Sequence, residues 1–207
     1  MKAFIYTGGA INPDLITERP AREDLRIAAD SGFRNAQALG QEVDLLLGDF
    51  DSLDVSKIDR KIEILRVPAE KDFTDTQLAV DTALKKGATE IVIIGGLDGR
   101  LDHTLSNLAI LEDLCEKQVC AVITNGFNRV RFLSSSSTLI AKSGFRYLSL
   151  LTLDRVAKGV CIEGCHYPLK NATLKNTFQY AVSNEITENC AFISVRKGRL
   201  LIVESAQ

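Results

Sequence analysis

The first 126 residues contain a series of short apolar runs, and this series is the feature that most constrains the fold. The runs are nearly continuous in apolar residues, and each is followed by a cluster of glycine, proline or polar residues. Such runs are typical of strands that are covered on both faces, and therefore of a parallel sheet. They predict strands over residues 3–6, 25–29, 43–47, 62–67, 90–94 and 119–124.

Two segments between these runs have apolar residues at helical spacing, over 74–86 and 103–117. Thr74 and Gln77 have the spacing of a capping box at the start of the first helix, and Gly87 is a plausible stop. In the second helix we expect five side chains to face the core: Leu105, Leu108, Ala109, Leu111 and Leu114.

The pattern changes after Gly126. Short strand-like segments follow one another with separators rich in Gly, Ser, Asn and Lys, and no convincing helix appears. The expected strands cover 129–135, 137–141, 147–153, 159–162, 178–182, 190–195 and 200–203. The sequence therefore predicts an α/β, Rossmann-like domain with a parallel sheet over 1–126, followed by an antiparallel β-sandwich over 127–207.

Charge and composition exclude some classes of partner. The chain has 25 Lys plus Arg and 27 Asp plus Glu among its 207 residues, a net charge of −2, which does not favour binding to nucleic acid. The apolar runs are too short to cross a bilayer, and Met1 and Lys2 lead directly into a strand-like segment. We expect a cytoplasmic protein with reduced cysteines and no membrane partner.

Acidic residues gather where the predicted parallel strands end. Ligands of open parallel sheets bind beyond the carboxyl ends of the strands. Carboxylates in this number repel one another unless a cation is present, and oxygen ligands suit Mg²⁺ together with phosphates. A single D-x-D such as Asp49 and Asp51 is more often a solvated turn, but acids at four strand ends favour a metal–phosphate site. The acids are Asp30, Asp49, Asp51, Asp72, Asp75 and Asp102.

A glycine-rich segment over 95–99 precedes the second helix, and this arrangement allows the backbone to approach an anion closely. The segment matches neither the P-loop nor the dinucleotide-binding fingerprint. Arg100 adds a planar cation suited to phosphate oxygens, and Lys71 is a second candidate.

Six motifs together resemble the signature set of the thiamine pyrophosphokinase family. In chain order they are ADSG at 29–32, GDFDS at 48–52, KDFTD at 71–75, GGLDGRLDH at 95–103, GCHYPL at 164–169 and VSNE at 182–185. Each motif alone is modest, but their order and spacing make the resemblance specific, and it covers nearly the whole chain.

The resemblance implies a diphosphokinase that transfers the pyrophosphoryl group of ATP to the hydroxyethyl oxygen of thiamine, giving thiamine diphosphate and AMP. It implies that the first domain binds ATP and Mg²⁺, that the second binds thiamine, and that the active sites lie between the subunits of a homodimer.

The same resemblance assigns roles to individual residues. Asp30, Asp49, Asp51 and Asp75 would arrange Mg²⁺. Contacts with ATP would come from Gly8, Lys71, Asp72, Thr74, Gly95, Gly96 and Arg100. Asp75, Arg100 and Asp102 would be catalytic. Thiamine would contact Asp102, Ser183 and Asn184.

Two features depart from the family pattern. The family often has Gly at the position of Asp98, so an additional carboxylate is expected near the phosphates here. Some relatives stack the thiamine pyrimidine on a Trp, but this chain has no Trp. Tyr167, Phe178 and Tyr180 are the candidate replacements.

Two other functions are compatible with some of these residues. A Mg²⁺-dependent phosphohydrolase could use the Asp49/Asp51 pair, with Asp49 as nucleophile, although such enzymes normally place D-x-D after the first strand rather than the third. A non-catalytic nucleotide-sensing module would explain the glycine-rich loop, but it would leave the many carboxylates without a purpose.

Overall fold

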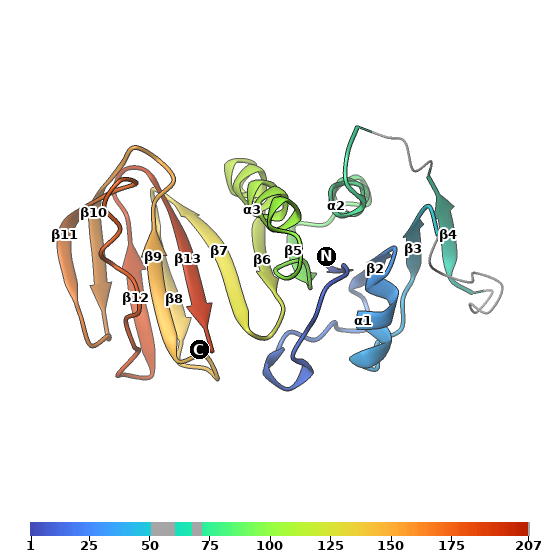
Figure 1. Cartoon of the computed structure of the whole chain (residues 1–207), viewed down its shortest axis with the longest axis horizontal. Coiled ribbons are helices and arrows are strands. Elements are labelled where there is room, and N and C mark those ends of the chain that lie inside the picture. Colours follow the sequence, from blue (N-terminus) through green and yellow to red (C-terminus); the bar gives the residue numbers. More distant parts are fainter. Residues whose placement is uncertain (51–60, 68–71, 207) are drawn as a thin grey trace. The chain divides into compact units, whose positions relative to one another are not determined.

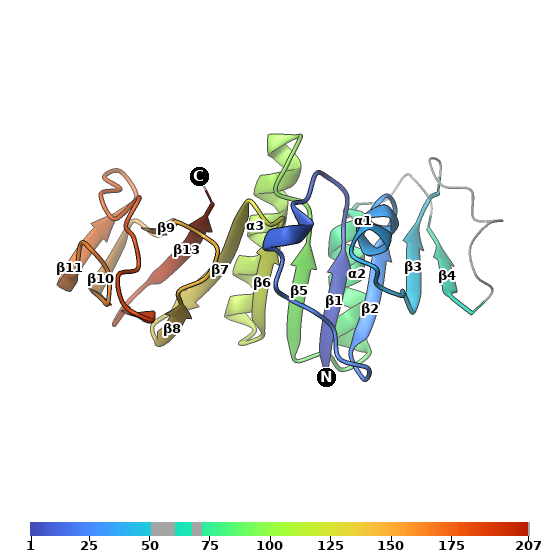
Figure 2. The same cartoon turned by 90° about the horizontal axis from the view of Figure 1, so that it is seen from below.

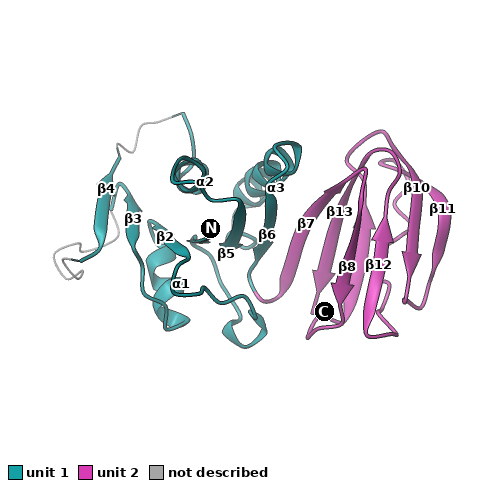
Figure 3. Cartoon of the chain, turned by 180° about the vertical axis from the view of Figure 1, so that it is seen from behind, with its two compact units in different colours: residues 1–125 teal, residues 126–207 magenta. Residues whose placement is uncertain are grey.

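A computed structural model describes residues 1–50, 61–67 and 72–206 of the chain (Figure 1). These residues form two compact units, unit 1 over residues 1–125 and unit 2 over residues 126–207 (Figure 3). Two of the predicted site residues, Asp51 and Lys71, lie outside the described residues.

Unit 1 is built on a parallel sheet, as the apolar runs predict. Its strands lie in the order β4-β3-β2-β1-β5-β6, and every described neighbouring pair is parallel. Four of the six strands are buried at most of their positions because both faces of the sheet are covered. The strands are β1 (Lys2–Tyr6), β2 (Leu25–Ala29), β3 (Leu45–Gly48), β4 (Glu63–Arg66), β5 (Glu90–Ile94) and β6 (Cys120–Thr124).

Helices cover both faces of this sheet. Figure 1 shows α2 (Asp75–Lys85) and α3 (Leu101–Glu116) on one face and α1 (Gly32–Ala38) on the other, and Figure 2 shows the same unit from below. A short 3-10 helix, η1 (Pro13–Leu15), follows β1. None of the helices in the described ranges is both long and apolar enough to span a bilayer.

Local sequence explains where the helices begin and what they bury. The Thr74 hydroxyl accepts a hydrogen bond from the Gln77 N–H at 3.2 Å, which confirms the cap expected at the start of α2. In α3 the expected core face is correct for Leu111 and Leu114. It is wrong for Leu105 and Ala109, which are exposed because α3 turns Asn107, Ile110, Leu111 and Leu114 toward the interior.

Unit 2 is an antiparallel β-sandwich. One layer has the strand order β7-β13-β9 and the other has the order β11-β10-β12-β8. Both layers contribute to one apolar core, which includes Leu148, Ile162, Ile193 and Ile202. The strands are β7 (Asn128–Ser134), β8 (Ser137–Ala141), β9 (Tyr147–Leu151), β10 (Val156–Glu163), β11 (Leu169–Lys175), β12 (Cys190–Ser194) and β13 (Arg199–Ser205).

Two segments of unit 2 differ from the sequence prediction. Residues 178–182 are not a strand, although they are rich in aromatic and β-branched residues. The strand β11 was not predicted, since its sequence is largely polar and its pairing with β10 contains register shifts. Pairing with β10, rather than burial or the local apolar pattern, makes β11 a strand.

Candidate active site

The strand order of unit 1 reverses between β1 and β5, and this is where an open parallel sheet binds its ligands. The loop after β1 and the loop after β5 meet at this point. Thr7 donates its N–H to the Ile94 carbonyl oxygen at 2.9 Å, and Gly96 donates its N–H to the Gly8 carbonyl oxygen at 2.9 Å. The fold therefore brings together the predicted ATP-binding residues Gly8, Gly95 and Gly96.

Glycine is required where these two loops meet. Gly95 has a φ of +100°, and a Cβ atom added there would overlap the carbonyl oxygens of Thr7 and Gly8. Gly96 has a φ of +71°, and its Cβ would overlap the side-chain amide of Asn107. Because no side chain fits at either position, glycine is what allows the two loops and Asn107 to pack this closely.

Polar side chains that sequence reasoning missed hold the loops in place. Asn35 of α1 donates to the carbonyl oxygens of Thr7 and Gly9, at 2.7 and 3.0 Å. Asn107 of α3 donates to the Gly96 carbonyl oxygen at 2.9 Å. The one available signal was an Asn on the core face of a helix, since Asn107 is buried.

Asp30 has the most unusual environment of the predicted metal ligands. It follows β2 and has a φ of +45°, a strained conformation for a residue other than glycine. Its N–H donates to the Leu47 carbonyl oxygen at 2.7 Å, which holds it against the end of β3. Its Oδ1 atom is buried and has no hydrogen-bond partner among the described residues. Leaving a buried carboxylate oxygen unpaired is costly, so this environment suits a residue that binds a cation.

The surroundings of Asp30 fit Mg²⁺ in part. Gly48, at the end of β3, lies so close that a Cβ atom there would be 3.2 Å from the Asp30 Cα, and Asp49 follows directly. Hard oxygen donors at the ends of adjacent strands suit Mg²⁺. Within the described ranges, no three His, Cys, Asp or Glu residues are close enough together to hold a metal. The second acid of the D-x-D motif, Asp51, lies outside those ranges.

The start of α2 lies beside the loop after β1. The hydroxyl of Thr76 in its first turn is 3.1 Å from the hydroxyl of Thr7, and this contact is buried. Asp75 is the first residue of α2, Thr74 is its cap, and Asp72 is exposed just before the helix. The contact between the two threonines therefore links the segment containing Asp72, Thr74 and Asp75 to the loop containing Gly8.

Arg100 and Asp102 are paired with each other at the start of α3. The guanidinium donates two hydrogen bonds to the carboxylate, at 3.1 and 2.5 Å, and both side chains are more than half exposed. This hydrogen bonding lowers the pKa of Asp102 and raises the pKa of Arg100, so both groups stay charged at neutral pH. The Arg100 side chain does not cap α3, but the Asp102 carboxylate accepts a hydrogen bond from the His103 N–H in the first turn at 2.9 Å.

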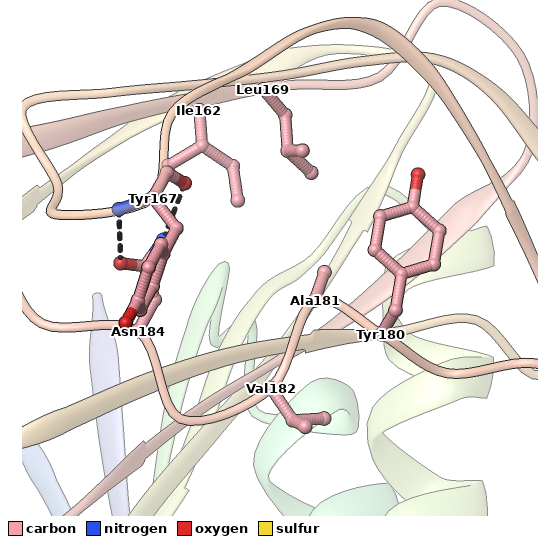
Figure 4. A pocket seen from close by; sticks show the side chains of 7 residues that line it. All are labelled: Ile162, Tyr167, Leu169, Tyr180, Ala181, Val182 and Asn184. Atoms are coloured by element: carbon pink, nitrogen blue, oxygen red, sulfur yellow. Dashed lines mark hydrogen bonds between the residues drawn. The ribbon is translucent and has the colours of Figure 1, made fainter.

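Unit 2 contains an apolar pocket of about 350 Å³. Figure 4 shows Tyr180 on one side of it and Tyr167, beside Asn184, on the other. The size and lining are those of a small-molecule pocket. The lining residues are Ile162, Tyr167, Leu169, Tyr180, Ala181, Val182 and Asn184.

The two predicted thiamine ligands of unit 2 have different surroundings. Asn184 is buried, and its amide pairs with the backbone of Tyr167, accepting from the N–H at 2.9 Å and donating to the carbonyl oxygen at 2.8 Å. Ser183 is exposed, with a φ of +56°, and its N–H donates to the Ser149 hydroxyl at 3.0 Å. Asn184 therefore fixes the position of Tyr167, while the Ser183 side chain lies at the surface.

The three aromatic candidates differ in whether they line this pocket. Tyr167 and Tyr180 line the pocket, whereas Phe178 does not line it and packs on Tyr180 with ring centroids 5.7 Å apart. Tyr180 donates its hydroxyl to the Thr173 carbonyl oxygen at 3.3 Å. Tyr167 is 63% exposed, and its ring contacts the edge of His166.

Two family models match this chain, one in each unit. The model described as "Thiamin pyrophosphokinase, catalytic domain" matches residues 18–123, which is half of the chain. The model described as "Thiamin pyrophosphokinase, vitamin B1 binding domain" matches residues 137–200. The chain belongs to the thiamin pyrophosphokinase family. The resemblance seen in the six motifs is confirmed, and so is the prediction of an enzyme of the thiamine diphosphokinase class.

Individual members of the family are similar along their whole length. The chain is 30% identical over 208 residues to the thiamine pyrophosphokinase of Bacillus subtilis, covering 97% of both chains. A crystal structure of the B. subtilis enzyme superposes with a TM-score of 0.90 at 26% identity, covering 100% of each chain. A family member from Enterococcus faecalis gives a TM-score of 0.84 at 28% identity, again over 100% of both chains. These similarities confirm the predicted order of an α/β part followed by an antiparallel β part.

Proposed function

We propose that this chain transfers the pyrophosphoryl group of ATP to the hydroxyethyl oxygen of thiamine, forming thiamine diphosphate and AMP. The observation that carries this proposal is the point in unit 1 where the strand order reverses. There, the glycine-containing loops after β1 and β5 contact each other. Asp30 follows the neighbouring strand β2, and its buried Oδ1 atom has no hydrogen-bond partner among the described residues. Family membership adds thiamine as the acceptor.

The nucleotide half of the site would bind the triphosphate through backbone and charge. Gly8, Gly95 and Gly96 would allow the phosphates to approach the backbone, and Arg100 would contact phosphate oxygens. We assign Lys71, Asp72 and Thr74 to the same region. Transfer of this kind requires mainly positioning and neutralisation of charge, so a covalent nucleophile is unnecessary.

Asp30, Asp49, Asp51 and Asp75 would hold Mg²⁺, since carboxylates at neighbouring strand ends suit this ion. When bound, Mg²⁺ would neutralise charge on the triphosphate. Asp75, the first residue of α2, would also be a catalytic residue. Asp102 would lie close to the acceptor, where Arg100 keeps its carboxylate ionised.

The pocket of unit 2 would bind the aromatic part of thiamine. Tyr167 and Tyr180 offer flat faces for stacking, and thiamine is a cation, which aromatic rings attract. Ser183 would contact the aminopyrimidine at the pocket edge. Asn184 would act by holding Tyr167 in place, since its amide is already engaged with the Tyr167 backbone.

We further propose that the enzyme is a cytoplasmic homodimer with sites shared between subunits. Leu101 and Leu105 of α3 are 70% and 56% exposed next to Arg100 and Asp102, an apolar surface that a second copy could cover. Two impaired variants, one in each unit, test this directly when activity is assayed with thiamine well below its KM. Mixed Asp30→Asn and Tyr167→Ala chains should recover activity, because one site of each mixed dimer is intact. No recovery, with mixed dimers demonstrated, would mean that each site belongs to one chain.

The reaction itself is tested with purified protein, Mg-ATP and thiamine, with the products separated by chromatography. We expect AMP and thiamine diphosphate in equal amounts, and no product after chelation of the metal. ADP would show transfer of a single phosphoryl group. Phosphate release independent of thiamine would indicate the phosphohydrolase alternative, and ATP binding without turnover would indicate the nucleotide-sensing module.

A further inference from the structure

The carboxylate of Asp98 occupies a backbone donor two residues after Gly8, which belongs to the proposed nucleotide site. Asp98 lies in the loop after β5, and its Oδ2 atom accepts a hydrogen bond from the N–H of Ala10, in the loop after β1, at 3.2 Å. The two residues are 88 positions apart in the chain. Both are exposed, so the Ala10 N–H would be open to a ligand if the carboxylate moved away.

The rest of the loop after β1 is held without Asp98. Asn35 binds the carbonyl oxygens of Thr7 and Gly9, and the Gly8 carbonyl oxygen accepts from Gly96. These contacts take up the carbonyl groups of Thr7, Gly8 and Gly9, and none of them involves Asp98. Ala10 is the position at which a negative group of the chain itself is bound.

We propose that Asp98 is an internal anion that occupies the Ala10 N–H in the free enzyme and competes with the phosphates of ATP for it. The proposal rests on the proposed nucleotide site. Its physical basis is that a carboxylate and a phosphate oxygen seek the same donor, and that the two negative groups repel each other at close range. Nucleotide binding would therefore require the Asp98 carboxylate to leave Ala10.

Two variants separate this role from that of a simple latch between the loops. Asp98→Asn keeps an oxygen that can accept from Ala10 but removes the charge, whereas Asp98→Ala removes both. For an internal anion, both variants lower the KM for Mg-ATP and the Kd for inorganic tripolyphosphate, by about threefold to fivefold, the range of an exposed charge interaction. The kcat and the KM for thiamine stay close to wild type.

The control is Asp113→Asn, which makes the same change in net charge in the last part of α3, where Asp113 pairs with Lys117. It should leave ATP affinity unchanged. The gain in the Asp98 variants should shrink as salt is raised from 0.05 to about 0.5 M, because salt screens exposed charges. Such a salt dependence would not follow from a purely structural role.

Three results would overturn the proposal. Weaker binding by Asp98→Ala with unchanged binding by Asp98→Asn would make Asp98 a latch. Weaker binding by both variants would make it a contributor to nucleotide affinity, and no change in either would remove it from the site. These results are distinct from failure of the proposed function, in which the wild-type enzyme itself forms no AMP and thiamine diphosphate.

Discussion

The sheet edge of unit 1 and the pocket of unit 2 are built in opposite ways. At the sheet edge the ion pair of Arg100 and Asp102 is at the surface, whereas Asp30 has a buried carboxylate oxygen with no hydrogen-bond partner among the described residues. In unit 2 the exposed residues that line the pocket are apolar or aromatic, namely Tyr167, Tyr180 and Val182. Among the residues that the structure describes, no charged one lines this pocket. Elsewhere unit 2 has buried or partly buried ion pairs, such as Glu204 with Arg129 and Arg131, and an exposed pair of Arg146 with Glu185.

The two regions also differ in what forms the binding surface. In unit 1 the surface is largely backbone, fixed by positive φ angles at Gly95, Gly96 and Asp30. In unit 2 it is formed by side chains, and the Asn184 amide fixes the position of Tyr167 through two hydrogen bonds to the Tyr167 backbone. A backbone surface suits phosphate and a cation, whereas an aromatic surface suits a flat organic ring. Substitutions should therefore have different consequences in the two units.

The largest effect is expected at Asp30. Asp30→Asn should reduce kcat/KM by about 100-fold or more, because a neutral amide is a poor ligand for Mg²⁺. Asn tolerates a positive φ, and the change neutralises a carboxylate whose buried Oδ1 has no partner among the described residues, so the thermal midpoint should stay level or rise. Steady-state kinetics and thermal unfolding together test this.

Asp44→Asn is the matched control for Asp30→Asn. Asp44 accepts two hydrogen bonds from the Arg26 guanidinium, at 3.0 and 2.9 Å, and it directly precedes β3, at the opposite end of that strand from Gly48 and the proposed site. This variant should lose stability and keep its activity. If Asp30→Asn behaved in the same way, Asp30 would be structural and would not bind a cation.

The next effect is expected at Gly95. Gly95→Ala should lower the free energy of unfolding by about 3 kcal/mol, because the Cβ atom meets the backbone of Thr7 and Gly8 and the φ is positive. Gly99→Ala has the same strain of a positive φ, but nothing lies near its Cβ, so it should cost about 1 kcal/mol. Denaturant unfolding measures both values. If the two variants lost the same free energy of unfolding, the contact between the two loops would contribute little to stability.

A smaller effect is expected in the pocket of unit 2. Tyr167→Ala should raise the KM for thiamine about tenfold, in line with the contribution of one stacked aromatic ring. Tyr167→Phe keeps the ring and should be close to wild type, and the KM for ATP should not change in either variant. A larger effect of Tyr180→Ala than of Tyr167→Ala would transfer the stacking role to Tyr180.

The smallest effect is expected at the ion pair of Asp154 and Arg199. Hydrogen bonds from Arg199 lower the pKa of Asp154 below its unfolded value, so the pair stabilises the fold at neutral pH. This contribution is lost as the pH falls from about 4 through the lowered pKa. Asp154→Asn should cost about 1 kcal/mol at pH 7 and progressively less in acid, as measured by denaturant unfolding at each pH. A loss that did not depend on pH would mean that shape, rather than charge, holds the pair together.

Much of unit 1 could be predicted because its signals are local. Continuous apolar runs identify buried strands, and Thr74 with Gln77 identifies a helix start. The helix α1 was not identified, since its seven residues are too short to show a clear period. Leu105 and Ala109 of α3 are exposed. The apolar spacing therefore predicts the helix correctly, but it does not predict how wide the buried face of the helix is.

Unit 2 was harder to predict because its strands depend on their neighbours. Residues 178–182 have the composition of a strand, yet they include Tyr180, Ala181 and Val182 of the pocket wall. The strand β11, with a positive φ at Asn171, has few apolar residues and is defined by its pairing with β10. The sequence offered Tyr167, Phe178 and Tyr180 as replacements for a stacking Trp. Of these, Tyr167 and Tyr180 line the pocket, and Phe178 does not.

The sequence by itself determined the family, the order of an α/β part and a β part, and the acidic strand ends, because each of these depends on residues close together in the chain. Only the tertiary structure showed that the loops after β1 and β5 meet, that Asp30 has a buried oxygen without a partner among the described residues, and that Asp98 binds the Ala10 N–H. These contacts join residues far apart in sequence. They depend on the strand order of the sheet, which local spacing does not encode.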